Sequence, residues 1–268
     1  MPTDRPEADG TLSWTTTTVV VVQVSAEGTV GTGWTYASTA CVPLVEGVLA
    51  TALDGIGWTD VGAAHEAMVR ACRNLGRPGL VGCAISAVDV ALWDLKARLL
   101  DLPLVALLGR CEHRVPVYGS GGFTTYDDEA TTRQLERFAG EWGCRAVKLK
   151  IAESWGTEEE RDLARVALAR QVVGDDVAVM VDANGGYHRK QAIRLGRQLV
   201  AAHAVSWFEE PVSSQDLDGL RLVRDTVECE VAAGEYLFDE RDATSMLRSG
   251  AVDVLQVDAT RCGGYTSW

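Results

Sequence analysis

Acidic side chains end several short apolar runs in the second half of the chain. The runs VAVMVD, AVSWFE and EVAAGE end at Asp182, Glu209 and Glu235. Carboxylate oxygens are hard ligands, and three monodentate carboxylates leave about half of an octahedral shell open for water or substrate oxygens. Gathered in one place, this set suits Mg²⁺ better than Zn²⁺. The alternative is that each acid caps the helix that follows it.

Two basic residues are placed to act on the same side of a strand. Lys148 and Lys150 lie two residues apart in AVKLK, so both side chains point the same way. If that side is buried, like-charge repulsion lowers the proton affinity of each lysine, and a nearby divalent cation lowers it further. One lysine is then neutral enough at pH 7 to take a proton, and the other binds an anionic substrate group. The alternative is a surface strand with two exposed lysines.

These residues belong to a repeating pattern of strand and helix. Apolar runs end at Lys150, Asp182, Glu209, Glu235 and Asp258, with spacings of 32, 27, 26 and 23 residues. Amphipathic stretches such as EEERDLARVALARQVV and RKQAIRLGRQLVAA lie between them. The spacing fits one strand, one helix and two short loops per unit. Parallel strands with helical crossovers form an open sheet or a barrel. We favour the barrel, because it brings all the strand ends around one mouth.

The first part of the chain shows a different pattern of expected strands and helices. WTTTTVVVVQV (residues 14–24) predicts a strand, which WTYAS can pair with, and apolar residues recur at helical spacing near 43–75 and 82–100. The polar linker CEHRVP follows. We therefore predict an α+β domain over residues 1–114 and an α/β domain over 115–268. The first ten residues, polar and acidic with two prolines, are expected to be a frayed leader.

Charge and composition narrow the function. A net charge of −13 argues against nucleic acid or an anionic membrane as the main partner. No basic-then-apolar signal peptide is present, and no apolar run approaches the ~20 residues of a membrane span, so we expect a cytoplasmic protein with a small-molecule ligand. The seven cysteines show no metal-ligand spacing and are expected to be idle thiols. The sequence is compatible with a homo-oligomer and does not decide the oligomeric state.

Five motifs in order carry a resemblance to a known family. KLK, VDANGGY, WFEEP, AAGEY and LQVDATRCGG together resemble the mandelate racemase and muconate lactonizing enzyme family of the enolase superfamily, and AVDVALWDLKARLLDLPLVALLG resembles its N-terminal capping domain. The resemblance implies a (β/α) TIM-type barrel behind a capping domain. It also implies that Asp182, Glu209 and Glu235 are Mg²⁺ ligands, and that Lys150 is the base with Lys148 as its electrostatic partner.

The resemblance extends to an activity. In such a family an enediolate forms when a lysine removes the proton beside a substrate carboxylate, with Mg²⁺ stabilising the charge. Asp258 matches the aspartate that orients a histidine from the next strand, or else it caps the turn into ATRCGG. Asn184 either touches substrate or water, or closes an Asx turn. We expect dehydration of an acid sugar; the alternative is a racemase or epimerase of a 2-hydroxy acid.

The chain is shorter than the resemblance requires. A barrel of about 250 residues with a capping domain of about 110 needs about 360, and only about six of eight strands are recognisable here. None of the four histidines fills the partner position, because two lie in helical patterns, one in the linker and one in a loop (His65, His203, His113 and His188). Either the sequence is a fragment of a longer enzyme, or the chain is complete and is a non-catalytic, metal-binding remnant or interaction protein.

Overall fold

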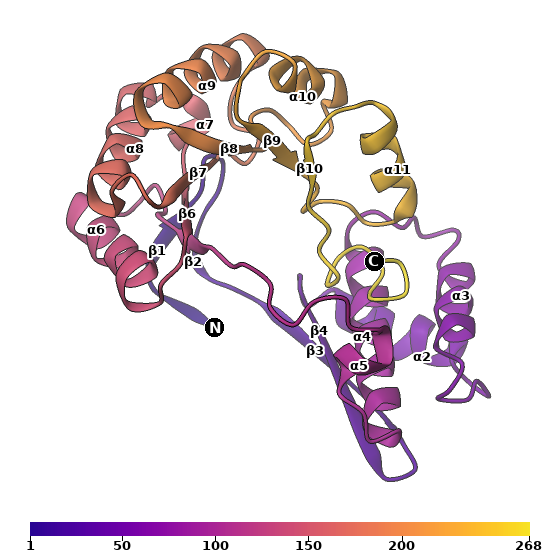
Figure 1. Cartoon of the computed structure of the whole chain (residues 1–268). Coiled ribbons are helices and arrows are strands. Elements are labelled where there is room, and N and C mark those ends of the chain that lie inside the picture. Colours follow the sequence, from indigo (N-terminus) through magenta and orange to yellow (C-terminus); the bar gives the residue numbers. More distant parts are fainter.

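The computed structural model describes residues 1–268, which form two regions (Figure 1). The first contains an antiparallel hairpin packed on helices. The second is a curved parallel sheet whose helices form the outer arc in Figure 1. This architecture confirms the predicted fold class, a partial (β/α) barrel of six strands preceded by an α+β unit.

The α+β region is built on one long helix and one hairpin. The helix α4 (Leu80–Leu99) packs against β3 (Val19–Ala26) and β4 (Thr29–Tyr36). The approach is close, because a Cβ added at Gly33 would lie only 2.0 Å from the carbonyl oxygen of Ala87 on α4. The other helical segments are α1 (Cys41–Pro43), the π-helical stretch η1 (Leu44–Leu49), α2 (Ala50–Ala52), α3 (Val61–Ala71) and α5 (Leu104–Leu108).

Three local expectations for this region are corrected. The helical stretch expected near 43–75 is interrupted over 53–60, where Gly55 has a φ of +79° that an α-helix does not accommodate. The strand expected over 14–24 is split between β2 (Ser13–Thr16) and β3, which belong to different sheets.

The third correction concerns the N-terminus. Residues 2–8 are not a frayed leader but the strand β1 (Pro2–Ala8), which pairs antiparallel with β2. The turn between β1 and β2 rests on the parallel sheet region: Thr124 donates from its backbone N to the Ala8 carbonyl (2.8 Å), and Trp155 donates to the Gly10 carbonyl (2.8 Å). This pairing and these contacts order a segment whose polar composition alone predicts disorder.

The strands of the parallel sheet are hydrogen-bonded in chain order, with no strand skipped. Its strands are β5 (Gly119–Gly121), β6 (Ala146–Lys150), β7 (Ala178–Asp182), β8 (Val205–Glu209), β9 (Glu230–Ala233) and β10 (Val254–Leu255). The helical segments between them are α6 (Asp128–Glu136) with its π-helical continuation η2 (Arg137–Glu141), α7 (Glu153–Gly156), α8 (Glu159–Val173), α9 (Arg189–His203), α10 (Leu217–Arg224) and α11 (Glu240–Arg248). Each crossover therefore returns the chain to the same end of the sheet.

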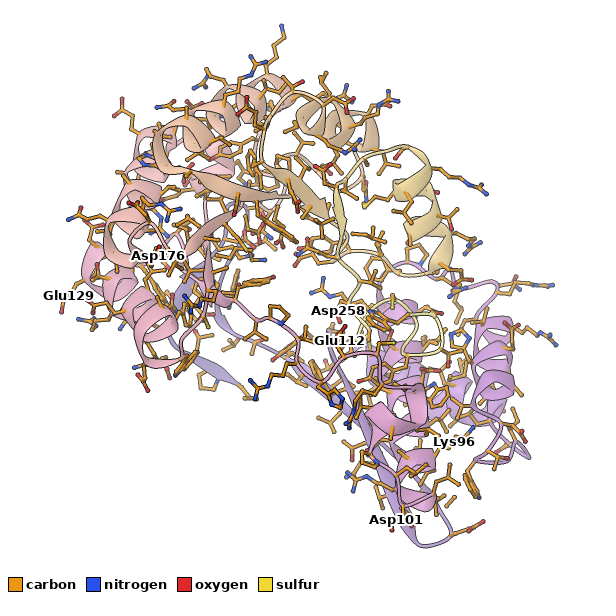
Figure 2. The ribbon with its side chains drawn as sticks, viewed as in Figure 1. Lys96, Asp101, Glu112, Glu129, Asp176 and Asp258 are labelled. Atoms are coloured by element: carbon orange, nitrogen blue, oxygen red, sulfur yellow. The ribbon has the colours of Figure 1, made fainter.

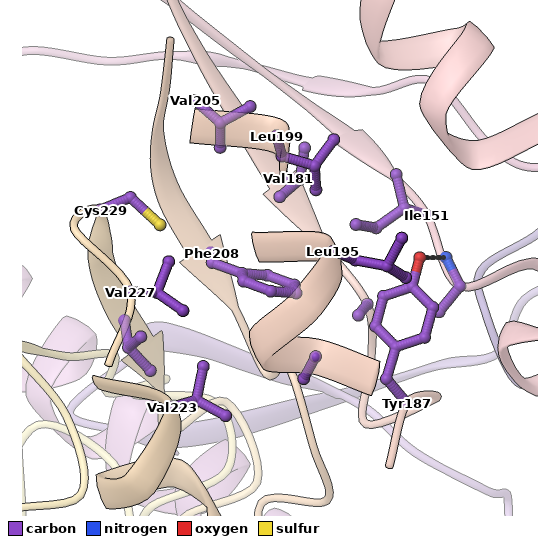
Figure 3. Close-up of a cluster of buried hydrophobic side chains, with 14 of the residues drawn as sticks. Ile151, Val181, Tyr187, Leu195, Leu199, Val205, Phe208, Val223, Val227 and Cys229 are labelled. Atoms are coloured by element: carbon purple, nitrogen blue, oxygen red, sulfur yellow. Dashed lines mark hydrogen bonds between the residues drawn. The ribbon is translucent and has the colours of Figure 1, made fainter. Parts of the chain in front are cut away.

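Between this sheet and its helices lies the larger hydrophobic core. It contains 27 buried residues, and Figure 3 shows part of it, with Phe208 of β8 beside Leu195 and Leu199 of α9. Tyr187 lies at the rim of the same cluster (Figure 3), its ring in edge contact with that of Phe208. Because this core holds the strands in place, it also fixes the positions of the side chains at their carboxyl ends.

The expected strand ends agree with the structure in three places and differ in two. β6, β7 and β8 end at Lys150, Asp182 and Glu209 as predicted. β9 ends at Ala233 and β10 at Leu255, before Glu235 and Asp258. Gly234 explains the first difference, because its φ of +135° turns the chain out of the sheet.

The segment after β10 packs back on the α+β region. The Thr35 hydroxyl donates to the Thr260 carbonyl (2.7 Å), and the backbone N of Thr266 donates to the buried Asp89 carboxylate on α4 (3.0 Å). The predicted domain boundary at 114/115 lies in the extended stretch between α5 and β5 and stays a prediction. All seven cysteines are free thiols. None of the helices has the length and apolar character needed to cross a bilayer.

Candidate active site at the strand ends

Three residues stand in one row across three neighbouring strands. Lys150 of β6 is in register with Asp182 of β7, which is in register with Glu209 of β8. Neighbouring strands lie about 4.8 Å apart, and register partners project to the same face. The parallel pairing of the sheet therefore gathers side chains that are far apart in sequence.

Lys148, two residues before Lys150, completes a buried cluster with this row. Its ammonium donates to Glu209 Oε2 and lies 3.8 Å from Asp182 Oδ2, while Lys150 donates to Asp182. The carboxylate side chains are 0% exposed, and the side chains of Lys148 and Lys150 are 7% and 15% exposed. The strand is thus no surface strand with free lysines. Two ammonium groups and two carboxylates balance each other's charge in the barrel interior.

The electrostatics of this cluster correct one expectation. Burial works against the charged lysines, but Asp182 outweighs it, together with Glu209 for Lys148, and the pKa values of both lysines are raised. From the sequence we expected like-charge repulsion to leave one lysine neutral at pH 7. The raised pKa values are opposite to that expectation. The carboxylate partners lie closer and dominate the like-charge repulsion.

The pKa values of the Glu209 and Asp182 carboxyl groups shift in opposite directions. Burial raises the pKa of Glu209 to about 7, helped by the charge of Asp182 and opposed by Lys148. Burial also disfavours ionised Asp182, but Lys150 and Lys148 overcome it and lower the pKa of that carboxyl group. Asp182 is therefore held as an anion by its two lysines.

Glu210 is a further buried acid that the sequence argument did not single out. It is 1% exposed, and burial raises its pKa to about 9, with the charges of Glu235 and Asp182 contributing. Its φ of +37° lies in the left-handed region, which a non-glycine residue adopts at a cost. The sequence feature that could have identified Glu210 is its place as the second glutamate of the EEP run, directly after the end of β8.

Glu235 reaches the cluster through an asparagine. The Asn184 side-chain amide donates to Glu235 Oε1 over 3.4 Å, while the backbone N of Asn184 donates to Asp182 Oδ1 over 2.9 Å. Asn184 thus closes the Asx turn and also links two of the three predicted ligands. In this arrangement, no three His, Cys, Asp or Glu side chains stand close enough together to hold a metal ion.

Asp258 stands apart from the lysines. Its carboxylate accepts from the backbone N of Thr260 (2.7 Å) and lies 3.6 Å from the Arg261 guanidinium, so it closes the turn after β10 (Figure 2). Arg261 in turn donates to the backbone carbonyl of Glu235 (3.2 Å). Asp258 is thereby coupled to the chain at Glu235 and not to Lys148 or Lys150.

The donor chemistry around the row fits a hard divalent cation. Glu209 Oε1, Glu210 Oε1 and Asn184 Oδ1 are buried oxygen atoms without a hydrogen-bond partner. Leaving such an atom unpaired costs about 1–3 kcal/mol, so these oxygens favour a cation or donor that would pair them. No sulfur ligand lies among them, which agrees with an oxygen-binding ion.

Both halves of the chain match known family models. Residues 2–109 match the mandelate racemase / muconate lactonizing enzyme N-terminal domain, and residues 130–268 match the enolase C-terminal domain-like family. With its capping α+β region and its acid and lysine row, the structure is of the enolase-superfamily type. The chain belongs to the mandelate racemase and muconate lactonizing enzyme family of that superfamily.

Individual relatives agree with this assignment. L-talarate/galactarate dehydratase from Salmonella typhimurium is 32% identical over 258 residues, covering 92% of this chain and 62% of that protein. Its crystal structure, liganded with Mg and L-lyxarohydroxamate, superposes with a TM-score of 0.88 at 28% identity, covering 99% of this chain and 70% of that one. A mandelate racemase/muconate lactonizing enzyme-like protein from Rubrobacter xylanophilus gives a TM-score of 0.92 at 45% identity, covering 99% and 73%.

The relatives differ in reaction and in length. They include dehydratases, cycloisomerases and epimerases. The chain spans about half to two thirds of the length of the curated relatives that it matches. Membership of the family therefore does not by itself fix one reaction.

Proposed function

We propose that this chain carries the site for Mg²⁺-dependent removal of the proton alpha to a carboxylate, followed by loss of water from an acid sugar. The observation that carries the proposal is the buried row of Lys150, Asp182 and Glu209, with Lys148 against it. A core that only needed stability would be served as well by apolar residues, because buried ion pairs gain little net stability.

Asp182, Glu209 and Glu235 are the residues that would hold Mg²⁺. When bound, the ion supplies positive charge that stabilises the second negative charge developing on the substrate carboxylate. Asp182 and Glu209 already lie in register on neighbouring strands, and Glu235 approaches through Asn184. Lys148 and Lys150 pair with carboxylate oxygens of Glu209 and Asp182 in the structure, so these acids would have to rearrange to share a metal ion.

Lys150 is the residue proposed to take the alpha proton, and Lys148 to offset negative charge on the substrate. An ion pair with Asp182 raises the pKa of Lys150, so Lys150 becomes a base only when Asp182 has another cationic partner. Asp258 is proposed to orient a general acid that protonates the leaving hydroxyl, which departs as water. The sequence here contains no histidine placed for that task, so this step rests on the family resemblance.

Two other functions follow from the same residues. A racemase or epimerase would share the proton abstraction and return a proton to the opposite face, and an epimerase is among the relatives. A metal-binding protein without catalysis would use the carboxylates alone. The three functions differ in what happens to the alpha carbon.

Incubating the full chain with Mg²⁺ and a panel of acid sugars in D₂O separates these functions. Dehydration gives a 2-keto-3-deoxy acid, detected by NMR and mass spectrometry. Epimerisation gives deuterium at the alpha carbon without loss of water. Mg²⁺ binding by calorimetry with no exchange on any acid would leave only the non-catalytic function, and absence of binding as well would refute all three.

A further inference from the structure

Four of the five residues that directly follow Ile151 have backbone conformations in the left-handed region. Ala152, Ser154 and Trp155 have φ values of +63°, +53° and +60°, and Gly156 has +74°. A non-glycine residue in this left-handed region is strained, so such a run persists only where its surroundings hold it. We call residues 152–156 the left-handed segment.

A buried side-chain pair holds the start of this segment. The backbone N of Ala152 donates to Asp162 Oδ2 (3.0 Å) and approaches Tyr187 Oη (3.1 Å), the bond dashed in Figure 3. The Tyr187 hydroxyl itself donates to Asp162 Oδ2 (2.6 Å), and Glu153 N donates to Asp162 Oδ1 (3.3 Å). Asp162 thus accepts three hydrogen bonds where the chain leaves β6.

The same helix also holds the other side of this strand end. Arg165, one turn after Asp162 on α8, is 3% exposed. Its guanidinium donates to the Phe123 carbonyl (3.0 Å) and approaches the Lys150 carbonyl (3.5 Å). Asp162 therefore binds backbone N–H groups just after Lys150, and Arg165 binds backbone carbonyls at Lys150 and in the neighbouring loop.

The Tyr187 ring adds a steric contact to these polar ones. A Cβ at Gly156 would lie 2.6 Å from the Tyr187 ring, so the end of the left-handed segment is packed directly on it. Tyr187 comes from the loop after β7, five residues past Asp182. One side chain therefore ties the segment after Lys150 to the loop after Asp182.

We propose that Tyr187 and Asp162 are positioning residues for Lys150. They lock the left-handed segment, which fixes the end of β6 and so holds the Lys150 ammonium against Asp182. This inference rests on the proposed function for the meaning of Lys150 as a base. The held position of the lysine is itself a property of the chain that can be measured without turnover.

Tyr187→Phe is the sharpest variant, because it removes the hydroxyl and keeps the ring on Gly156. We expect kcat for alpha-proton exchange to fall about tenfold with KM changed less than about twofold, since the base and not the substrate contacts would be displaced. Asp162→Asn should act in the same direction. Val223→Ala, in the core away from the segment, is the control for lost stability alone.

A second readout does not depend on activity. Lysines are labelled with limiting acetic anhydride, and each site is followed by peptide mass spectrometry. In Tyr187→Phe we expect Lys150 to react several-fold faster than in the unaltered chain, with exposed Lys190 as the internal reference. Val223→Ala should leave the ratio of Lys150 to Lys190 labelling unchanged.

The outcomes separate the two proposals. Absence of exchange by the unaltered chain would remove the proposed function, while the labelling ratio still decides the positioning of Lys150. Equal Lys150 labelling in Tyr187→Phe and the unaltered chain would overturn the positioning role. A Val223→Ala variant that accelerates Lys150 labelling as much as Tyr187→Phe would also overturn it, because lost stability would then account for the effect.

Discussion

Lys148 on β6 and Glu209 on β8 are joined by a buried hydrogen bond although β7 lies between their strands. Both side chains reach across Asp182, whose Oδ2 is 3.8 Å from the same ammonium. Lys148 therefore compensates two buried carboxylates at once. Removing it leaves Lys150 as the one remaining ammonium group beside these two acids.

Lys148→Met tests this compensation. The change keeps an apolar stem and removes the ammonium, so at pH 7 we expect the free energy of unfolding to fall by about 3 kcal/mol, as when one partner of a buried ion pair is lost. Urea unfolding followed by circular dichroism measures it. Lys190→Met, at an exposed position, is the control. A variant as stable as the unaltered chain would show that the acids do not need this partner.

Glu209→Gln tests the proposed metal ligand. The amide keeps the shape but loses the charge, and we expect Mg²⁺ affinity measured by calorimetry to fall at least about tenfold, with proton exchange abolished. Glu240→Gln, on the outer helix α11, should bind Mg²⁺ like the unaltered chain. Unchanged affinity in Glu209→Gln would exclude this residue as a ligand.

Lys150→Ala tests the proposed base. Because the carboxylates remain, we expect Mg²⁺ affinity to be largely retained while deuterium incorporation on one face of the alpha carbon is lost. Chiral analysis of the deuterated acid measures this. Exchange at the original rate and with the original stereochemistry would assign the proton transfer to another residue.

The Asp162→Asn variant tests how the Asp162 carboxyl group makes the free energy of unfolding depend on pH. Burial raises the pKa of Asp162 to about 6, well above the ordinary value of about 3.9 for aspartate, against hydrogen bonds from Tyr187 and the backbone. Between about pH 4 and 6 the folded chain then binds more protons at this site than the unfolded chain, so the contribution of Asp162 to stability is lost as the pH rises.

Urea unfolding of both chains at pH 4, 5, 6 and 7 isolates this contribution, because asparagine does not titrate. The free energy of unfolding of the unaltered chain minus that of Asp162→Asn should decline by about 2 kcal/mol from pH 4 to 7. Other titrating groups cancel in the difference. A difference that grows with pH would mean that Asp162 is stabilised as an anion.

Gly33→Ala tests the close packing of the α+β region. The added methyl would lie 2.0 Å from the Ala87 carbonyl oxygen, so the hairpin must move away from α4, and we expect a loss of about 3 kcal/mol or more. Gly47→Ala, in a helical stretch with open space around it, should instead stabilise the chain by about 0.5–1 kcal/mol. Thermal unfolding compares the two.

The βα repeat was predictable because each unit is local. Apolar runs ending at Lys150, Asp182 and Glu209 became strands with those limits, and their parallel register then placed the three residues in one row. The ends at Glu235 and Asp258 were placed too late, since the conformation of Gly234 and the turn at Asp258 depend on neighbouring segments. Strand periodicity contains no information about such turns.

The missed residues follow the same logic. Asp162 and Arg165 lie on the same buried face of α8 as Val166 and Ala169. Two charged residues on an apolar helix face were a visible signal of a buried polar network. Their partners, the backbone after β6 and the Tyr187 hydroxyl, are fixed only by tertiary packing and could not be derived from spacing.

The contact between Asp89 and Thr266 joins residues 177 positions apart in the chain. During synthesis, α4 leaves the ribosome long before the residues that pair with its buried carboxylate. The Asp89 carboxylate therefore stays without this partner until residue 266 has been made. This high contact order makes slow, late consolidation of the first hundred residues the expected course of folding.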